Sequence, residues 1–337
     1  MDKEETLEIG TINIKGLREY KKRQKFRSYA KADILFVQET HWVNTRESSK
    51  WVLQMGYDRA IFTTYGSNAR GTAILIRGWE IEEEINDDEG RFSAGKIKKG
   101  DMKIIVICVY MPNTIPHGEN EEYMRKLRQV KNIINRLTTN EENAAIFIGG
   151  DINIAMDPGK DAIAEREVNT PDNCTNAWNE ILIEHGLVDE WRRENPFEKT
   201  YTYAPMGNNP NKIYRRLDYL FTDVRINANY VETKKQEVHI SDHKLVTVKF
   251  EGERAKWGKK SGLWRHNDSY NTEEDFILGA KLAIWEAKSE LHNSARAKFE
   301  YIKYKLGQFC RAYGAHCTKI KRERRLKVEM EFDALEN

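Results

Sequence analysis

Short apolar runs separated by polar turns recur through the first three quarters of the chain. They are rich in isoleucine and valine and have the length of β-strands. The predicted strands cover residues 7–14, 33–38, 72–77, 103–110, 144–148, 216–221 and 245–250. Several are apolar on both faces, which indicates sheets that are covered on each side. The pattern therefore predicts a layered α/β domain.

Between these runs, apolar residues recur at helical spacing. In residues 119–137 they lie three or four positions apart, on one stripe of a predicted helix. A second helix is predicted to begin at Thr175 as its N-cap and to end at Gly186, because a left-handed glycine commonly closes a helix. Residues 20–29 form a third, strongly basic candidate helix.

The pattern of apolar and polar residues changes after residue 250. Residues 252–261 are polar, basic and without periodicity, as in a linker. From Asn271, a candidate N-cap, a long amphipathic pattern runs to Tyr313 with the helical period, and Gly307 and Gly314 suggest a break near its end. We predict a catalytic domain over residues 1–251, a linker over 252–270 and a basic amphipathic helical extension over 271–337.

Composition limits the classes of function. The 337 residues include 55 Lys and Arg and 53 Asp and Glu, a net charge of +2. This balance argues against binding through uniform positive charge, and without long apolar runs we expect no membrane segment. The first residues are too polar for a secretory signal, so we expect a soluble protein of the nucleus or cytoplasm. The four cysteines lack the spacing of a zinc site and are expected to be free thiols.

Polar residues stand at the ends of the predicted strands in a way that packing does not require. They are Asn13, Glu39, Tyr110, Asp151, Asn153, Asp218 and the run Ser241-Asp242-His243. If the strands share sheets, their ends gather carboxylates, amides and one imidazole at one edge. Each residue alone also fits a turn, a cap or a solvent-facing position. Their joint occurrence points to chemistry.

Such a set suits the hydrolysis of phosphate esters. A hard divalent cation needs oxygen ligands, which Glu39, Asp242 and Asp151 can supply, and it polarises a phosphoryl oxygen. Neutral donors such as Asn13 and Tyr110 can stabilise charge on that oxygen. In this interpretation, Asp218 beside His243 fixes the ring tautomer and favours the imidazolium.

Six motifs give these residues a family resemblance. They are Thr11-Ile-Asn13-Ile-Lys-Gly-Leu17, Gln38-Glu39-Thr40-His41, Val109-Tyr110-Met-Pro-Asn113, Gly150-Asp151-Ile-Asn153, Arg216-Leu-Asp218-Tyr219 and Ser241-Asp242-His243. Their order and spacing resemble the endonuclease/exonuclease/phosphatase superfamily over residues 6–250. The resemblance implies a four-layer α/β sandwich, with two face-to-face β-sheets and helices outside. It also implies phosphodiester or phosphomonoester hydrolysis dependent on Mg²⁺, with Mn²⁺ as the alternative ion.

Within the superfamily, the chain is most similar to the apurinic-type endonuclease of non-LTR (LINE-like) retrotransposons. The similarity rests on the Gln-Glu-Thr-His run and on residues 187–196 and 199–203. Residues 262–265 and the long helix after them resemble a connector to a reverse transcriptase. Lys15 departs from the DNA-repair abasic endonucleases, which usually carry an acidic residue there.

Carried over by position, the resemblance implies a role for each motif residue. The metal would be held at Glu39, Asp242 and Asn13. Asp151 would act on the attacking water or the leaving group, and the choice between Asp151 and His243 as general base stays open. Asn153 and Tyr110 would bind the scissile phosphate, and His243 with Asp218 would stabilise the transition state. The expected substrate contacts are Thr202, Ser241 and Asn113.

Residues 204–215 form a loop rich in turn formers between two strand-like segments. By resemblance, it is the hairpin that enters the DNA groove. Asn208, Asn209, Lys212 and Arg215 would then contact bases or phosphates. A solvated loop without such contacts is the alternative.

Positive charge is concentrated in the predicted extension. Residues 252–337 hold 18 Lys and Arg against 13 Asp and Glu, a net of +5, which leaves residues 1–251 at 37 against 40, or −3. The extension is expected to add affinity for nucleic acid or to join a reverse transcriptase domain and its element RNA, and residues 321–325 resemble a nuclear-import patch. Its charged face is otherwise simply solvated.

Three classes of function compete. The first is an endonuclease that nicks double-stranded DNA and leaves a 3′-hydroxyl for target-primed reverse transcription. The second is a repair apurinic/apyrimidinic endonuclease or a phosphatase of the same superfamily. The third is a noncatalytic nucleic-acid-binding module, against which the intact set of polar residues argues.

Overall fold

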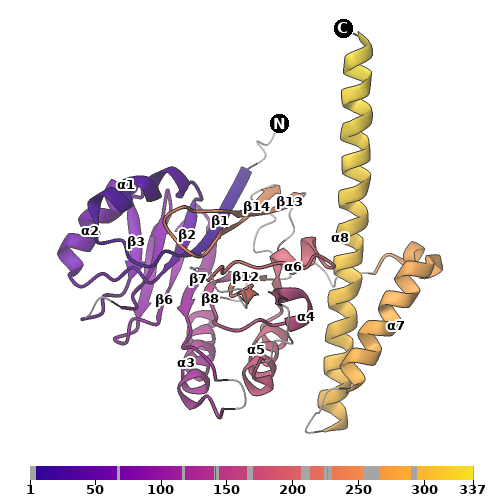
Figure 1. Ribbon diagram of the computed structural model, residues 1–337, viewed down its shortest axis with the longest axis horizontal. Coiled ribbons are helices and arrows are strands. Elements are labelled where there is room, and N and C mark those ends of the chain that lie inside the picture. Colours follow the sequence, from indigo (N-terminus) through magenta and orange to yellow (C-terminus); the bar gives the residue numbers. More distant parts are fainter. Residues whose placement is uncertain are drawn as a thin grey trace. The chain divides into compact units, whose positions relative to one another are not determined.

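The computed structural model describes residues 5–66, 69–115, 118–139, 141, 144–164, 170–205, 213–223, 226, 230–252, 266–289 and 294–336. The chain divides into two compact units. The first comprises residues 1–191 and 199–261, and the second comprises residues 192–198 and 262–337 (Figure 1). The predicted linker falls mostly outside the described residues, so the predicted domain boundaries stay a prediction.

The first unit contains two six-stranded sheets. One has the order β13 (Tyr230–Gln236), β14 (Leu245–Gly252), β1 (Glu5–Asn13), β2 (Ile34–Gln38), β4 (Thr72–Ile76), β3 (Arg59–Phe62). The other has the order β10 (Leu187–Asp189), β12 (Asp218–Asp223), β8 (Ala145–Asp151), β7 (Met102–Tyr110), β6 (Phe92–Lys99), β5 (Glu80–Asn86). Both are mixed, because β1 pairs with β2 in parallel and β7 pairs with β8 in parallel, among antiparallel neighbours.

The two sheets pack face to face. Their shared core includes Phe36 and Val248 from one sheet and Ile104 and Phe147 from the other. The contact is closest at Gly149, where an added Cβ would lie 2.1 Å from the Phe36 ring. Glycine is therefore required at this point because any larger residue would force the sheets apart.

Helices cover the outer faces. Phe26 of α1 (Tyr20–Tyr29) and Val52 of α2 (Thr45–Gln54) pack on the first sheet. On the second sheet, Trp178 of α5 (Asp172–Glu184) stacks on Phe221 of β12 with ring centroids 5.5 Å apart, and α3 (Glu121–Thr138) lies beside α5 (Figure 1). The predicted four-layer α/β sandwich is confirmed.

The remaining elements of this unit are short. They are α4 (Pro158–Asp161), the two-stranded pair β9 (Ala162–Ile163) and β11 (Tyr214–Arg215), and α6 (Glu190–Glu194), which crosses into the second unit. Thr175 is not a cap, since the N-cap of α5 is Pro171, four residues earlier than predicted. Proline suits this position because it cannot donate a hydrogen bond within a helix.

The second unit is a helical hairpin. A 3₁₀ turn, η2 (Asp268–Thr272), precedes α7 (Glu274–Ser289) and α8 (Ala295–Glu336), and Phe276 packs with Cys310 and Tyr313 in its core. The prediction of one continuous helix from Asn271 was wrong, and so was the break near Gly307 and Gly314, since α8 runs through both. Close packing of α7 against the ring of Phe309, which approaches Gly279, holds α8 helical there.

Among the described residues, every helix is too short or too polar to cross a membrane.

Candidate active site

The polar residues predicted from the strand ends meet at one edge of the sandwich. Asn13 ends β1 beside Gln38 of β2, and Glu39 follows directly. In the other sheet, Asp151 of β8 lies between Tyr110 of β7 and Asp218 of β12 in the strand register. Residues 241–243 lead into β14, which pairs with β1. Strands from both sheets thus supply the site.

Glu39, which follows β2 of the first sheet, connects several residues of the site. Its Oε1 accepts hydrogen bonds from Asn13 Nδ2 at 2.9 Å and from Tyr110 Oη at 2.9 Å, and its Oε2 lies 3.3 Å from His41 Nε2. Burial opposes ionisation, but the hydrogen bonds from His41, Asn13 and Tyr110 outweigh it and lower the pKa of Glu39 to about 2. The carboxylate is therefore ionised at neutral pH.

Asp151 is fully enclosed on the other side of Asn13. Its Oδ2 accepts a second hydrogen bond from Asn13 Nδ2 at 3.0 Å, and its Oδ1 accepts the backbone N–H of Asn153 at 3.0 Å. Burial and the charge of Asp218 raise the pKa of Asp151 to about 7. A carboxyl with this pKa can gain or lose a proton near neutral pH.

His243 and Asp218 form a buried pair. His243 Nδ1 lies 2.8 Å from Asp218 Oδ2, which also accepts the hydroxyl of Thr202 at 2.6 Å. Burial lowers the pKa of His243, but the charge and hydrogen bond of Asp218 outweigh it and raise that pKa to about 9. The ring is therefore an imidazolium at neutral pH, with Nδ1–H donated to Asp218.

Asp151, Asp218 and His243 each offer one ligand atom, and these atoms lie within 4.8 Å of one another. Asp218 Oδ1 is buried and has no hydrogen-bond partner among the described residues. His243 shares a hydrogen bond with Asp218, and both groups lie close to Asp151. The protonation of each group therefore depends on the other two, as in a coupled acid and base.

The chemistry of the donor set fits a divalent cation. Glu39 presents an ionised carboxylate that only neutral donors and His41 contact among the described residues, and hard cations prefer such oxygens. Asn13 uses its amide nitrogen on Glu39 and Asp151, while its Oδ1 accepts the N–H of Lys15 at 3.2 Å. Asp242 is paired with Lys15, Nζ to Oδ2, at 2.8 Å.

The other predicted residues differ in their setting. Asn153 donates its Nδ2 to the Met111 carbonyl at 2.7 Å, and Ser241 donates its hydroxyl to the Asn13 carbonyl at 2.6 Å, so both brace the site. Thr202 is buried and donates its hydroxyl to Asp218, whereas Asn113 is exposed. Arg215 pairs its backbone with Tyr203 at the base of the predicted hairpin. Asn208, Asn209 and Lys212 lie outside the described residues.

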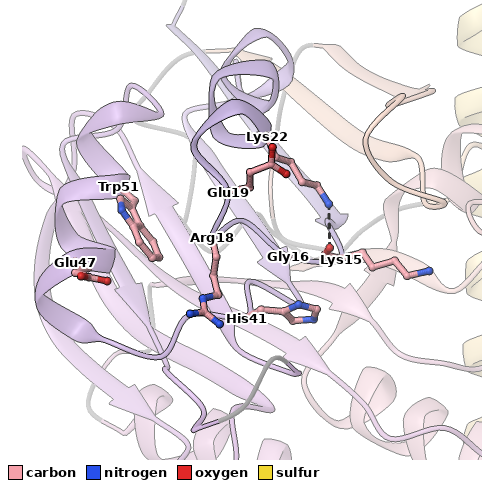
Figure 2. A pocket seen from close by; sticks show the side chains of 8 residues that line it. All are labelled: Lys15, Gly16, Arg18, Glu19, Lys22, His41, Glu47 and Trp51. Atoms are coloured by element: carbon pink, nitrogen blue, oxygen red, sulfur yellow. Dashed lines mark hydrogen bonds between the residues drawn. The ribbon is translucent and has the colours of Figure 1, made fainter.

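Sequence reasoning named His41 within a motif and Lys15 as a departure from the repair enzymes, but it predicted neither residue's contact. His41 reaches Glu39 because both residues adopt left-handed backbone angles, φ +56° and +54°, and Lys15 reaches Asp242 across 227 positions of sequence. A cavity of about 620 Å³ opens beside them, lined by residues of the β1–α1 and β2–α2 connections and by Lys22 of α1 and Glu47 and Trp51 of α2 (Figure 2). The position of His41, two residues after Glu39, was the available signal.

Comparison with known proteins finds a relative among transposon proteins. A 149 kDa transposon TX1 protein of Xenopus laevis is 23% identical over 284 residues, which cover 82% of this chain and 20% of that protein. This chain thus spans about a fifth of its relative's length. The predicted likeness to retrotransposon proteins is matched by a transposon protein.

Solved structures share the fold. The AP endonuclease of Leishmania major aligns with a TM-score of 0.61 at 20% identity, covering 73% of this chain and 87% of that chain. The catalytic domain of Xenopus laevis APE2 aligns with a TM-score of 0.56 at 18% identity, covering 73% and 93%. An AP endonuclease of Archaeoglobus fulgidus aligns with a TM-score of 0.56 at 22% identity, covering 72% and 99%.

The family assignment rests on the sequence match. Residues 10–243, which contain every predicted motif, match the Endonuclease/Exonuclease/phosphatase family. The chain belongs to this family.

Proposed function

We propose that the chain is a metal-dependent DNA endonuclease that nicks double-stranded DNA for target-primed reverse transcription by a non-LTR retrotransposon. The observation that supports it most is the network at the sheet edge, where Asn13 links Glu39 to Asp151 and Asp218 holds His243. The transposon relative supports the biological setting. Mg²⁺, or Mn²⁺ as the alternative, would bind at Glu39, with Asn13 and Asp242 nearby.

The proposed reaction breaks one phosphodiester bond. A water oxygen attacks phosphorus, the bond from phosphorus to O3′ breaks, and the products are a 3′-hydroxyl and a 5′-phosphate. The bound cation would polarise a phosphoryl oxygen and stabilise the leaving oxyanion. Asp151 takes the proton of the attacking water, since its raised pKa makes it a base near neutral pH.

His243 serves a different role in this mechanism. Because its pKa is raised to about 9, it is already protonated and is a poor base at neutral pH. Its second ring nitrogen donates to a phosphoryl oxygen, where charge grows in the transition state. Tyr110 donates its one hydroxyl hydrogen to Glu39, so it adds a neutral donor on the same side only when that hydroxyl turns to the phosphate. Thus the pair Asp151 and His243 divides base and charge stabilisation between them.

The finer assignments belong to the same proposal. Residues 1–251 form the catalytic domain, and residues 271–337 form a basic helical extension after a linker. Asn153, Ser241, Thr202 and Asn113 line or support the substrate site. The loop positions Asn208, Asn209, Lys212 and Arg215 contact DNA. A reverse transcriptase domain with its element RNA is the proposed partner, and the nucleus is the proposed compartment.

A plasmid assay tests the activity. Supercoiled DNA is incubated with the full chain and Mg²⁺ or Mn²⁺, and the nicked product is then offered to a DNA polymerase, which extends only a 3′-hydroxyl. We expect metal-dependent nicking that Asp151→Asn and His243→Gln each reduce by at least about 10³-fold. Asp101→Asn, an exposed aspartate in the turn between β6 and β7, is the matched control and keeps wild-type activity.

An abasic oligonucleotide in the same assay separates the alternatives. Cleavage of the abasic strand preferred by orders of magnitude over intact DNA would replace the proposal with a repair endonuclease. No cleavage of either substrate by a folded wild-type chain would favour the noncatalytic module.

A further inference from the structure

Lys15 lies in a tightly fixed turn after β1. Its backbone is left-handed, with φ +54°, and Gly16 follows with φ +95°. Its N–H donates to Asn13 Oδ1 at 3.2 Å, and Gly16 N–H donates to the Glu39 carbonyl at 2.6 Å. These hydrogen bonds fix the turn to Asn13 and Glu39, two residues of the site.

Lys22 clamps the same turn from α1. Its Nζ donates to the Ile14 carbonyl at 2.7 Å. It also donates to the Lys15 carbonyl at 2.9 Å (Figure 2). Figure 2 shows the Lys15 side chain extending away from Trp51 and Glu47 on the far side of the cavity. Since the backbone is held at both ends, the direction of this side chain is built into the fold.

The ammonium of Lys15 meets Asp242. The two groups are 2.8 Å apart, and the Asp242 side chain is only 7% exposed against 52% for Lys15. A nearly buried carboxylate is thus neutralised by a cation of the chain itself, as buried charges require.

The two carboxylates of this edge therefore have unlike partners. Glu39 is held by Asn13 and Tyr110, which are neutral, and by His41. Asp242 is held by a fixed positive charge. Among the described residues, no lysine or arginine pairs with Glu39, so its charge is available to a divalent cation. The charge of Asp242 is already paired with Lys15.

We propose that Lys15 is a built-in cation that neutralises Asp242, so that the site binds a single divalent ion at Glu39 and Asp242 does not ligate it. The inference rests on the proposed function, in which Glu39 holds the metal. Lys15 then sets both the number of ions and their affinity, because ligand charge is a main determinant of cation binding. Removing its charge frees Asp242 and removes a repulsion.

Calorimetric titration of the full chain with Mn²⁺, without DNA, tests the inference. Wild type should bind one ion. Lys15→Met should bind Mn²⁺ about tenfold more tightly, or take up a second ion, because it gains a free carboxylate. Asp242→Asn alone should weaken binding, because it leaves the Lys15 charge unpaired beside the site. In the Lys15→Met background it should cancel the gain, so that the double variant binds as wild type does.

Two further variants serve as controls. Lys15→Arg retains the charge and should bind as wild type does. Lys21→Met removes an exposed lysine of α1 and should also leave the affinity unchanged. Circular dichroism confirms that each variant is folded.

Distinct outcomes separate this inference from the proposed function. If Glu39→Gln abolishes binding while Lys15→Met binds as wild type does, the inference is overturned and the metal assignment stands. A loss of tenfold or more in the double variant Lys15→Met with Asp242→Asn, compared with wild type, would also overturn it, since Asp242 would then be a ligand. If wild type binds no Mn²⁺, or Glu39→Gln binds normally, the metal assignment fails and the inference fails with it.

Discussion

Thr202 fixes the position of Asp218, the carboxylate that keeps His243 protonated. Its hydroxyl donates to Asp218 Oδ2 and accepts the backbone N–H groups of Leu217 at 3.0 Å and of Asp218 at 3.1 Å. The threonine is completely buried, so water cannot replace these bonds. A change here reaches the imidazole through Asp218.

Thr202→Val tests this positioning role. The valine has a similar shape but no hydroxyl, so Asp218 loses a donor and two backbone donors lose their acceptor. We expect the nicking rate to fall about 10- to 100-fold, as for other residues that orient catalytic groups. Thr202→Ser keeps the oxygen and should restore most of the rate. A purely structural role would lower Tm in both variants without separating their rates.

The pH dependence of nicking reports the two raised pKa values. Asp151 must be ionised to act as base, so the rate rises as pH increases through about 7. His243 must be protonated, so the rate falls as pH increases through about 9. The sign of each limb follows from which form is active, and the expected profile is a bell.

Asp218→Asn assigns the upper limb. Without the charge of Asp218, burial lowers the pKa of His243, and the descending limb should move to lower pH. The ascending limb should also move down, because the charge of Asp218 raises the pKa of Asp151. Initial rates across pH 5 to 10 measure both shifts. An upper limb that stays near pH 9 in Asp218→Asn would contradict the role given to His243.

At the scale of elements, two helices support the turn that carries Asp151 and Asn153. Tyr123 of α3 donates its hydroxyl to the Ile152 carbonyl at 2.7 Å, and Trp178 of α5 donates its Nε1 to Tyr123 Oη at 2.8 Å. All three groups are buried. One tyrosine thereby ties the helical layer to the turn that carries Asp151 and Asn153.

Tyr123→Phe should therefore destabilise the fold. The change leaves a buried carbonyl and a buried indole N–H without this partner, at a cost of about 1–3 kcal/mol in the free energy of unfolding. Urea denaturation measures it, with Tyr20→Phe as control, since Tyr20 is 55% exposed. Equal stability of the two variants would show that the chain of hydrogen bonds adds nothing.

The sequence predicted central elements better than edges. Strands such as β4 and β8 are buried along their whole length, and their continuous apolar runs were recognised. β5 was missed because it is an edge strand that alternates isoleucine with glutamate and so has few apolar residues. The helical hairpin was read as one helix, because both helices keep the same apolar period across the connection.

The same contrast holds for the site. The sequence identified four residues of the site because each stands at the end of a predicted strand, and strand ends of one sheet meet at its edge. They are Asn13, Glu39, Asp151 and Asp218. The pairing of Lys15 with Asp242 depends on a left-handed turn and on contact between distant segments, neither of which leaves a local pattern. Predicting it requires the fold.

At the scale of the whole molecule, charge is divided unevenly along the chain. Residues 1–251 have a net charge of −3, from 37 basic and 40 acidic residues, and residues 252–337 have +5, from 18 and 13. A net negative charge on residues 1–251 suits cation binding but repels DNA phosphates. If the chain binds DNA as proposed, long-range attraction must then come mainly from the basic C-terminal part.

The cluster near the end of α8 provides the test. In the full chain, Lys319, Lys321, Arg322, Arg324 and Arg325 are changed together to glutamine, which removes five positive charges. If these residues bind phosphates, the slope of log affinity against log salt should become shallower by about one for each phosphate that is no longer neutralised, and affinity should fall most at low salt. Fluorescence anisotropy with a duplex oligonucleotide measures the slope, and replacing Lys96, Lys98, Lys99 and Lys103 of β6 and β7 by glutamine is the comparison. An identical slope for wild type and the α8 variant would show that the extension does not hold DNA and would leave attachment to a further domain as its remaining role.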